Sequence, residues 1–447
     1  MTKINQSPRR AWQTAILVMV LLSVTLAQSI ELDLRQVREL ALKNNSEIKL
    51  ARKAVEKSGR QIEESRGKLL PTVSAFANYQ RAWELPTIFF DNPNGPGKIT
   101  FKMGSEHTLI SGLNFQQPLY LGGAAWNGYQ LSRLGKTMAE LQAGSTRESV
   151  LLNATSAYFG LLFARSAVAV METALQTAQE NLKQVQEFKA AGKASDFDVL
   201  RAEVQVATYQ PQVISARNNV RLAESRLRMV TGIDQQTELI IRDQLSYEPN
   251  SLVKQSVEDL YQLALEQRPE VGMITLRKTM AEKQLSLARA VQIPSLVFNT
   301  AYRYQGERQD SQFTKDDFFK SFNSSIAINI PLFNGLQTRA KIQTAKIGIR
   351  EIEDQKEALL RNIRMEVEAA YFTMEEAEQK VTAQTKLVEQ AREAFRLAKL
   401  RYREGASTQL EVMNAELALN QAQMTYQQSL FEYNLAQAGL EKALNQL

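Results

Sequence analysis

The chain has 447 residues, of which 44% are hydrophobic and 23% are charged, with 11 prolines and no cysteine. This composition is typical of a folded protein, and the length exceeds that of one ordinary domain. The lack of cysteine excludes disulfide frameworks, thiolate nucleophiles, cysteine metal sites and a lipid-modified N-terminal cysteine. The formal net charge of +6 comes without a dense basic patch, so no nucleic-acid partner is predicted.

An export signal is predicted at the N-terminus. Lys3, Arg9 and Arg10 precede the apolar run 15–27, AILVMVLLSVTLA. This run is shorter than the roughly 20 residues that a membrane-spanning helix needs. We predict a signal peptide over residues 1–27, cleaved after Ala27; the alternative is a retained N-terminal anchor helix. Cleavage removes three basic and no acidic residues, which lowers the formal net charge from +6 to +3.

The rest of the chain consists of two copies of one unit. Pro71 in LPTVSAFANYQ corresponds to Pro294 in IPSLVFNTAYRYQ, 223 residues later. Pro118 in QPLYLGG corresponds to Pro331 in IPLFNGL, 213 residues later. The first copy therefore has ten extra residues between its two prolines. All four prolines are predicted to mark junctions between strands and helices. The predicted organisation is a first repeat over 28–230, an inter-repeat equatorial segment over 231–262 and a second repeat over 263–447.

Each copy contains two stretches that alternate as β-strands do. We predict strands at about 71–80 and 107–117 in the first copy and at about 294–304 and 323–331 in the second. Such strands match the weak signal of a transmembrane β-barrel, although half-buried sheets of soluble proteins alternate in the same way. The predicted apolar face consists of Val73, Ala75, Ala77, Tyr79, Leu109, Leu113, Phe115, Leu296, Phe298, Thr300, Tyr302, Tyr304, Ile326, Ile328 and Ile330.

Long helices follow the strands in each copy. Apolar residues recur in alternating steps of four and three over 150–185 and over 363–402, which is the 3.5-residue period of a coiled coil. A second seam of this kind begins after Gly192 and another after Gly405. A glycine inside a helix costs about 1 kcal/mol relative to alanine, so we interpret both glycines as turning points. The sequence predicts helical hairpins at about 123–230, with its tip at Gly192, and at about 336–446, with its tip at Gly405.

This order of elements resembles the TolC family of outer-membrane efflux and secretion channels over essentially the whole mature chain. The resemblance rests on 69-LLPTVSAFANYQ-80, on 116-QQPLYLGG-123 with its echo 329-NIPLFNG-335, on 155-TSAYFGLL-162, and on the two tips, 187-EFKAAGKASDFDVLRAE-203 and 401-RYREGASTQLEVMNAE-416.

The resemblance implies a mainly α fold with a β-barrel part. In the family, a homotrimer with four strands from each protomer forms a 12-stranded outer-membrane barrel, which a periplasmic α-helical tunnel continues. The implied function is passive conduction of substrates from an inner-membrane pump of RND, ABC or MFS type, through a periplasmic adaptor protein, to the outside. The implied location is the outer membrane of a Gram-negative bacterium, in contact with its lipid and with a large periplasmic part.

The resemblance also implies roles for residues near the tips. Asp198 and Glu411, each six positions after a tip glycine, would form negative rings at the periplasmic entrance and favour cations. The alternative for each is a solvated acid at a helix start, favoured by the helix dipole. The family often has a further acid where this chain has Asn414. Tyr402 with Asp198 matches a pairing that holds family gates shut, but an arginine sometimes found nearby is replaced by Ser407.

Adaptor docking in the family uses small residues around both tips, which here implies Gly192, Lys193, Ala194, Gly405, Ala406 and Ser407. No catalytic residue, cofactor or metal site is predicted, because the chain has one histidine, no cysteine and no phosphate-binding loop. The alternative function is a periplasmic coiled-coil adaptor or scaffold protein, which would also carry a signal and heptads but would lack paired amphipathic strands.

Overall fold

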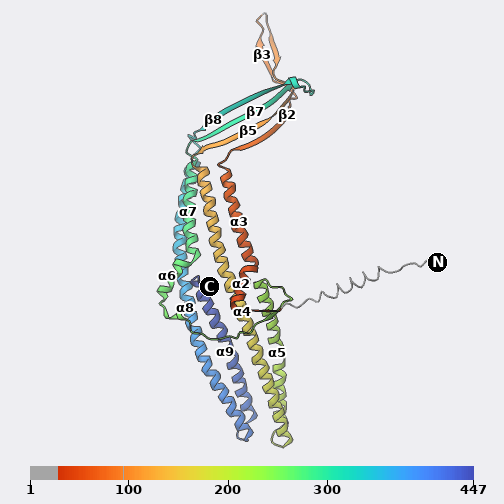
Figure 1. The fold of residues 1–447 in the computed structure, drawn as a ribbon, viewed down its shortest axis with the longest axis vertical. Coiled ribbons are helices and arrows are strands. Elements are labelled where there is room, and N and C mark those ends of the chain that lie inside the picture. The colour runs from red at the N-terminus through yellow and green to blue at the C-terminus, as the bar shows by residue number, and fades with distance from the viewer. Residues whose placement is uncertain (1–28, 94) are drawn as a thin grey trace, which may run out of the picture. The chain divides into compact units, whose positions relative to one another are not determined.

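The computed structural model describes residues 29–93 and 95–447, so the predicted signal peptide lies outside the described residues. The chain divides into two compact units. We call them the strand unit, formed by residues 52–142 and 269–359, and the helical unit, formed by residues 29–51, 143–268 and 360–447. Two helices of 67 residues each, α4 (Ala124–Ala190) and α8 (Gln337–Arg403), contribute segments to both units (Figure 1).

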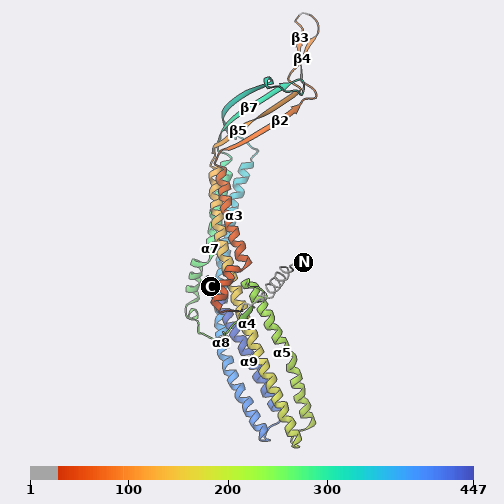
Figure 2. The same cartoon turned by 45° about the vertical axis from the view of Figure 1, so that its right-hand side comes forward.

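The strand unit contains a four-stranded antiparallel sheet in the order β2-β5-β7-β8 (Figures 1 and 2). Its strands are β2 (Thr72–Arg81), β5 (His107–Leu121), β7 (Ser295–Arg308) and β8 (Phe318–Asn329). Each copy of the repeat supplies two neighbouring strands, and the pairing of β5 with β7 joins the copies. Within the described chain, β2 and β8 each leave one edge without a partner strand.

The register places the predicted apolar residues of all four strands on one face, except Ile330, which follows the end of β8 at Asn329. Val73 lies opposite Phe115, Phe115 lies opposite Thr300, and Thr300 lies opposite Ser324. Because side chains alternate along a strand, residues two apart from these share their face. The other face is mostly polar. Its polar members include Thr72, Ser74, Asn78, Gln80, Asn114, Gln116, Asn299, Arg303, Gln305, Ser321, Asn323, Ser325 and Asn329.

The helices of the strand unit extend from one end of the sheet and do not cover its faces (Figures 1 and 2). They are α3 (Ser46–Gly67), α7 (Pro269–Ala290) and the first parts of α4 and α8. Pro71 and Pro294 directly precede β2 and β7, and Pro331 lies between β8 and α8. Pro118 lies inside β5, next to a register shift against β7. A strand can pass a proline at such an irregularity, so β5 runs four residues beyond its predicted end at 117.

The connection between β2 and β5 contains a second, separate ribbon, which the sequence analysis did not predict. Its strands are β3 (Thr87–Asp91) and β4 (Lys98–Lys102), paired antiparallel. The ten extra residues of the first copy lie in this connection. The corresponding connection between β7 and β8 contains only a short 3-10 turn, η2 (Lys315–Asp317).

The helical unit contains two hairpins. The first pairs α4 with α5 (Asp196–Thr231), and the second pairs α8 with α9 (Gln409–Ala443). In each hairpin a cluster of buried residues packs the two helices together, and the clusters match. Ala178 and Tyr209 of the first hairpin lie 213 residues before Ala391 and Ala422 of the second. Predicted seam residues that the structure buries in α4 and α8 include Val150, Ala154, Ala157, Leu161, Ala164, Val185, Ile363, Val367, Met374, Ala377, Val381 and Val388.

The segment between the repeats contacts the hairpins through backbone carbonyl groups. Arg165 of α4 donates to the Ile241 carbonyl at 2.9 Å, and Asn434 of α9 donates to the Ser246 carbonyl at 3.1 Å. This part of the unit also contains two short parallel strands, β1 (Ser29–Glu31) and β6 (Glu238–Ile240), the turn η1 (Ser251–Lys254), and two short helices, α2 (Leu34–Asn44) and α6 (Val257–Gln267).

A glycine at the centre of the sheet gives the first testable prediction. A Cβ atom added to Gly112 of β5 would lie 2.2 Å from the backbone oxygen of Tyr302 in β7. The backbone cannot yield without breaking the pairing of the two strands, so Gly112→Ala should destabilise the fold by at least about 1–3 kcal/mol. The measurement is the thermal unfolding midpoint of the purified protein.

Gly128→Ala is the matched control. Gly128 lies within α4, and a Cβ atom there meets no heavy atom within 4 Å. Alanine in a helix is favoured over glycine by roughly 0.5–1 kcal/mol, so this variant should unfold at the same or a higher temperature. Equal midpoints for the two variants would contradict the strand packing described above.

Candidate functional site

The two hairpin tips have the same backbone turn. Gly192 and Gly405 both have φ +74°. In the first tip the amide of Lys193 donates to the carbonyl of Phe188 at 2.7 Å, and the second tip repeats this bond at 2.8 Å. This arrangement is a Schellman motif, in which glycine adopts the left-handed conformation without the strain of a Cβ atom. The tip glycines therefore end α4 and α8 and reverse the chain.

The residues that the resemblance implies for adaptor docking lie around these turns. Gly192, Lys193, Gly405 and Ala406 are exposed, while Ala194 and Ser407 are half-buried. A short ion pair of 2.5 Å between Lys189 and Asp196 also bridges the first tip. Each tip thus presents an exposed turn, with small side chains and, at the first tip, Lys193.

The two predicted entrance acids occupy helix-capping positions. The Asp198 carboxylate accepts hydrogen bonds from the Ser195 amide at 3.0 Å and the Ser195 hydroxyl at 2.7 Å. These bonds lower the pKa of Asp198. In the second tip, the Glu411 amide donates to the Thr408 hydroxyl at 3.3 Å, and the Glu411 carboxylate accepts from the Ser407 hydroxyl at 2.8 Å. The sixth position after each tip glycine is therefore the third residue of the returning helix, where Asp198 accepts from a backbone amide as in a capping box and Glu411 accepts from a hydroxyl.

Tyr402 joins the two hairpins through its ring. It packs against Phe188 of α4 with 5.5 Å between the ring centroids. Burial, together with the negative charge of Asp198, raises the pKa of Tyr402. Among the described residues no hydrogen bond joins Tyr402 to Asp198, whose carboxylate bonds to Ser195 instead. Asn414 is exposed on α9.

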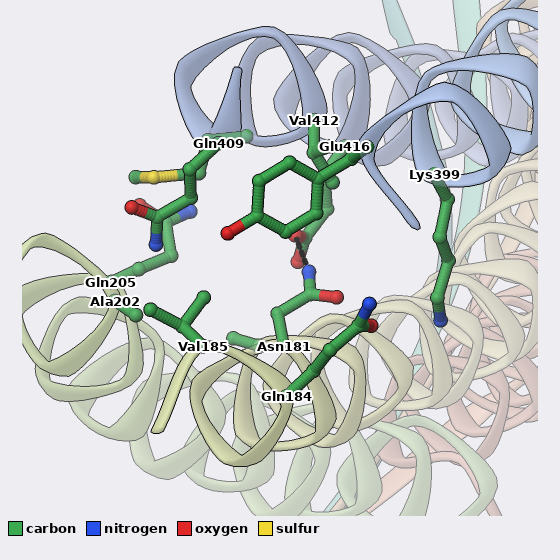
Figure 3. A pocket seen from close by; sticks show the side chains of 12 residues that line it. Asn181, Gln184, Val185, Ala202, Gln205, Lys399, Gln409, Val412 and Glu416 are labelled. Carbon is green, nitrogen blue, oxygen red and sulfur yellow. Dashed lines mark hydrogen bonds between the residues drawn. The ribbon is translucent and has the colours of Figure 1, made fainter. Parts of the chain in front are cut away.

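Two buried polar contacts between the hairpins were missed by the sequence analysis. The side-chain amide of Asn181 in α4 donates to Glu416 in α9 at 2.6 Å (Figure 3). One turn further along α9, Asn420 donates to the hydroxyl of Tyr209 in α5 at 2.9 Å. The heptad pattern after Gly405 places Val412, Ala415 and Leu419 on its seam and leaves Glu416 beside it. A sequence signal for Glu416 is its place four residues, or one helical turn, after Val412.

Glu416 is 1% exposed and borders a cavity of about 20 Å³ between the hairpins. Its second carboxylate oxygen has no hydrogen-bond partner among the described residues, and neither has the side-chain oxygen of the buried Gln409 on the same helix. Burial raises the pKa of Glu416 to about 7, while the bond from Asn181 and the charge of Lys399 act in the opposite direction. Residues 29–93 and 95–447 contain no group of three or more histidine or acidic side chains arranged to hold a metal ion.

Comparisons with known proteins agree with this architecture. A family model described as "Outer membrane efflux protein" matches residues 37–233 and 260–446, which correspond to the two repeats. The outer membrane protein TolC of Vibrio cholerae serotype O1 is 22% identical over 389 residues, covering 86% of this chain and 84% of that protein. The alkaline protease secretion protein AprF of Pseudomonas aeruginosa is 22% identical over 404 residues, covering 90% and 82%.

A solved structure shares the fold. The outer membrane protein VceC of Vibrio cholerae aligns with a TM-score of 0.74 and 17% identity, covering 92% of this chain and 96% of that one. The predicted fold class, mainly α with a β-barrel part, is confirmed by this likeness and by the strands and helices described above. Since the family model matches most of both repeats, the chain belongs to the outer membrane efflux protein family.

Proposed function

We propose that three copies of the chain form one passive channel through the outer membrane, fed by an inner-membrane pump through a periplasmic adaptor protein. The observation that carries this proposal is the four-stranded sheet, with an apolar face, a mostly polar face and two free edges. A sheet of this kind fits a barrel wall, because its apolar face suits lipid and its polar face suits a water-filled lumen.

The free edges of the sheet support assembly from several copies. Inside a bilayer every backbone N–H and C=O group needs a partner within the protein. Four strands cannot provide partners for the outer edges of β2 and β8. If β2 of each copy pairs with β8 of the next, three copies close a ring of 12 strands and leave no edge in contact with lipid.

The hairpin tips are the proposed periplasmic entrance. Asp198 and Glu411 place carboxylates at the starts of α5 and α9, where the helix dipole favours a negative charge. Repeated around a three-fold axis, they would form a negative ring that favours cations. The small and exposed residues at the tip glycines are the proposed contact with the adaptor. A pump of the RND, ABC or MFS type would supply the energy, since the sequence has no phosphate-binding loop.

The first prediction of this proposal concerns the ring of strands. The chain has no native cysteine, so any disulfide that forms must join the introduced cysteines. Asn78→Cys in β2 should form a disulfide with a cysteine placed at Ser321, Asn323 or Ser325 in β8, all on the polar face. At one of these positions the oxidised protein should run as a covalent trimer in denaturing electrophoresis.

Two controls accompany this scan. A cysteine at the centre of β5 or β7 should give no link between chains, because both neighbours of these strands lie in the same chain. Each single-cysteine variant should remain monomeric on the denaturing gel. Failure of all three β2–β8 pairs to link in a protein that is correctly folded would contradict the ring.

The second prediction concerns conduction. Trimers reconstituted in a planar lipid bilayer should carry ionic current with a preference for K⁺ over Cl⁻. Glu411→Gln removes one carboxylate per protomer from the proposed ring, so the permeability ratio of K⁺ over Cl⁻, taken from the reversal potential, should fall severalfold. The control is Glu389→Gln, an exposed acid in α8 away from the tips. A protein that conducts no current would favour the periplasmic scaffold.

The third prediction separates two ways of holding the entrance narrow. If the ring contact between Tyr402 and Phe188 holds the hairpins together, Tyr402→Phe keeps the contact and Tyr402→Ala removes it. Single-channel conductance should then rise in the alanine variant alone. If a hydrogen bond from Tyr402 to Asp198 forms in the assembled channel and closes it, the phenylalanine variant and Asp198→Ala should both conduct more than the wild type.

A further inference from the structure

We propose that Glu416 is a proton-binding site between the two hairpins of each chain, and that proton release from it loosens their packing. Its place in the fold carries this inference. Glu416 lies on α9 of the second hairpin and is 1% exposed, yet its one hydrogen-bond donor, Asn181, belongs to α4 of the first hairpin. The protonation state of this carboxyl group therefore depends on whether the two hairpins are packed together.

The surroundings of Glu416 do not compensate a negative charge. Its second oxygen has no hydrogen-bond partner in the part of the chain that the structure describes, and the adjacent cavity of about 20 Å³ has room for a single water molecule. Lys399 lines the same cavity, but among the described residues it forms no ion pair with Glu416. A buried carboxylate with one donor is costly, whereas the protonated acid can keep the bond from Asn181 and lose the charge.

Every element around the cavity contributes polar groups, and only a few of them can ionise. The groups that line or face it are Asn181 and Gln184 from α4, Gln205 and Tyr209 from α5, Lys399 and Tyr402 from α8, and Gln409 from α9. Burial and the charge of Glu416 raise the pKa of Tyr209, and burial raises that of Tyr402. Both phenols therefore stay neutral near pH 7, and Glu416 is the group that titrates.

The direction of the pH effect follows from the burial. The pKa of Glu416 is raised from 4.5 to about 7 when the hairpins are packed. Packing is therefore most favoured below about pH 4.5, weakens as the pH rises towards 7, and stays at its weaker level above that. This difference changes the ratio of packed to separated hairpins by up to on the order of a hundredfold.

Neighbouring contacts explain why this one site can act locally. The Phe188–Tyr402 ring contact lies closer to the tips, and the Asn420–Tyr209 bond lies further from them. Loosening at Glu416 would therefore leave the Asn420–Tyr209 bond in place and weaken the hold on the tips, which the Phe188–Tyr402 ring contact still joins. In the proposed channel this would widen the entrance as the pH rises; the contact itself lies within one chain and does not depend on conduction.

The experiment uses a single introduced cysteine as a reporter of separation. Ala202 in α5 is 3% exposed and lines the cavity, so Ala202→Cys becomes accessible only when the hairpins part. Its alkylation rate in the trimer is measured with and without Glu416→Gln at about pH 5 and at about pH 8. The ratio of the two rates at each pH cancels the intrinsic reactivity of the thiol.

The glutamine variant imitates the protonated acid at every pH. We expect the rate to be at most severalfold higher with Glu416 present at about pH 5, and this ratio to grow by roughly tenfold or more at about pH 8. Glu389→Gln, an exposed control, should behave like the parent protein at both pH values. A ratio that stays the same at both pH values would overturn the inference even if the trimer conducts normally.

Infrared spectroscopy provides a second measurement that needs no reporter cysteine. A protonated carboxyl group has a carbonyl stretch distinct from that of a carboxylate. The difference spectrum between the wild type and Glu416→Gln should contain this band at about pH 5 and lose it at about pH 8. A spectrum without the band at about pH 5 would show that Glu416 is ionised when packed, which also overturns the inference.

Discussion

The need to pair every backbone N–H and C=O group inside lipid governs the rest of this structure. The central strands β5 and β7 meet that need within the chain, while β2 and β8 meet it on one side only. Four strands cannot close on themselves, because about eight are needed before a barrel interior has room even for side chains. Further copies of the same chain can supply the missing partners, so the free edges make the single chain incomplete in a membrane.

The same incompleteness is visible along the helices. Large apolar side chains remain exposed on the outer faces of both hairpins, although the inner seams of the hairpins are filled. They include Phe197, Leu200, Val204, Ile214 and Leu222 on α5 and Met365, Phe372, Leu387, Leu397 and Leu400 on α8. A single chain in water would leave this area uncovered, which is unfavourable for a soluble monomer. In the proposed ring, neighbouring chains cover these faces, so sheet and helices require the same assembly.

Most of the fold could be predicted because the apolar residues recur with two simple periods, one in the strands and one in the helices. The two-residue period placed the apolar residues of four strands on one face, and the 3.5-residue period with its repeated glycine located both hairpins. The β3–β4 ribbon was missed because its strands are short and a ribbon of two strands has no buried face to leave a pattern. The β1–β6 pair was missed for a related reason: each strand has three residues, and their pairing spans some 200 positions.

The acids of the helical unit show where sequence reasoning ends. Spacing from the tip glycines selects Asp198 and Glu411, because a fixed distance after a turn is also the capping position of the next helix. Both obtain donors from residues within four positions, so their hydrogen bonds follow from the local sequence. Glu416 obtains its donor from Asn181, 235 positions away, and loses water through packing of the other hairpin. Only the tertiary structure therefore distinguishes a carboxylate with local donors from one whose protonation depends on hairpin packing.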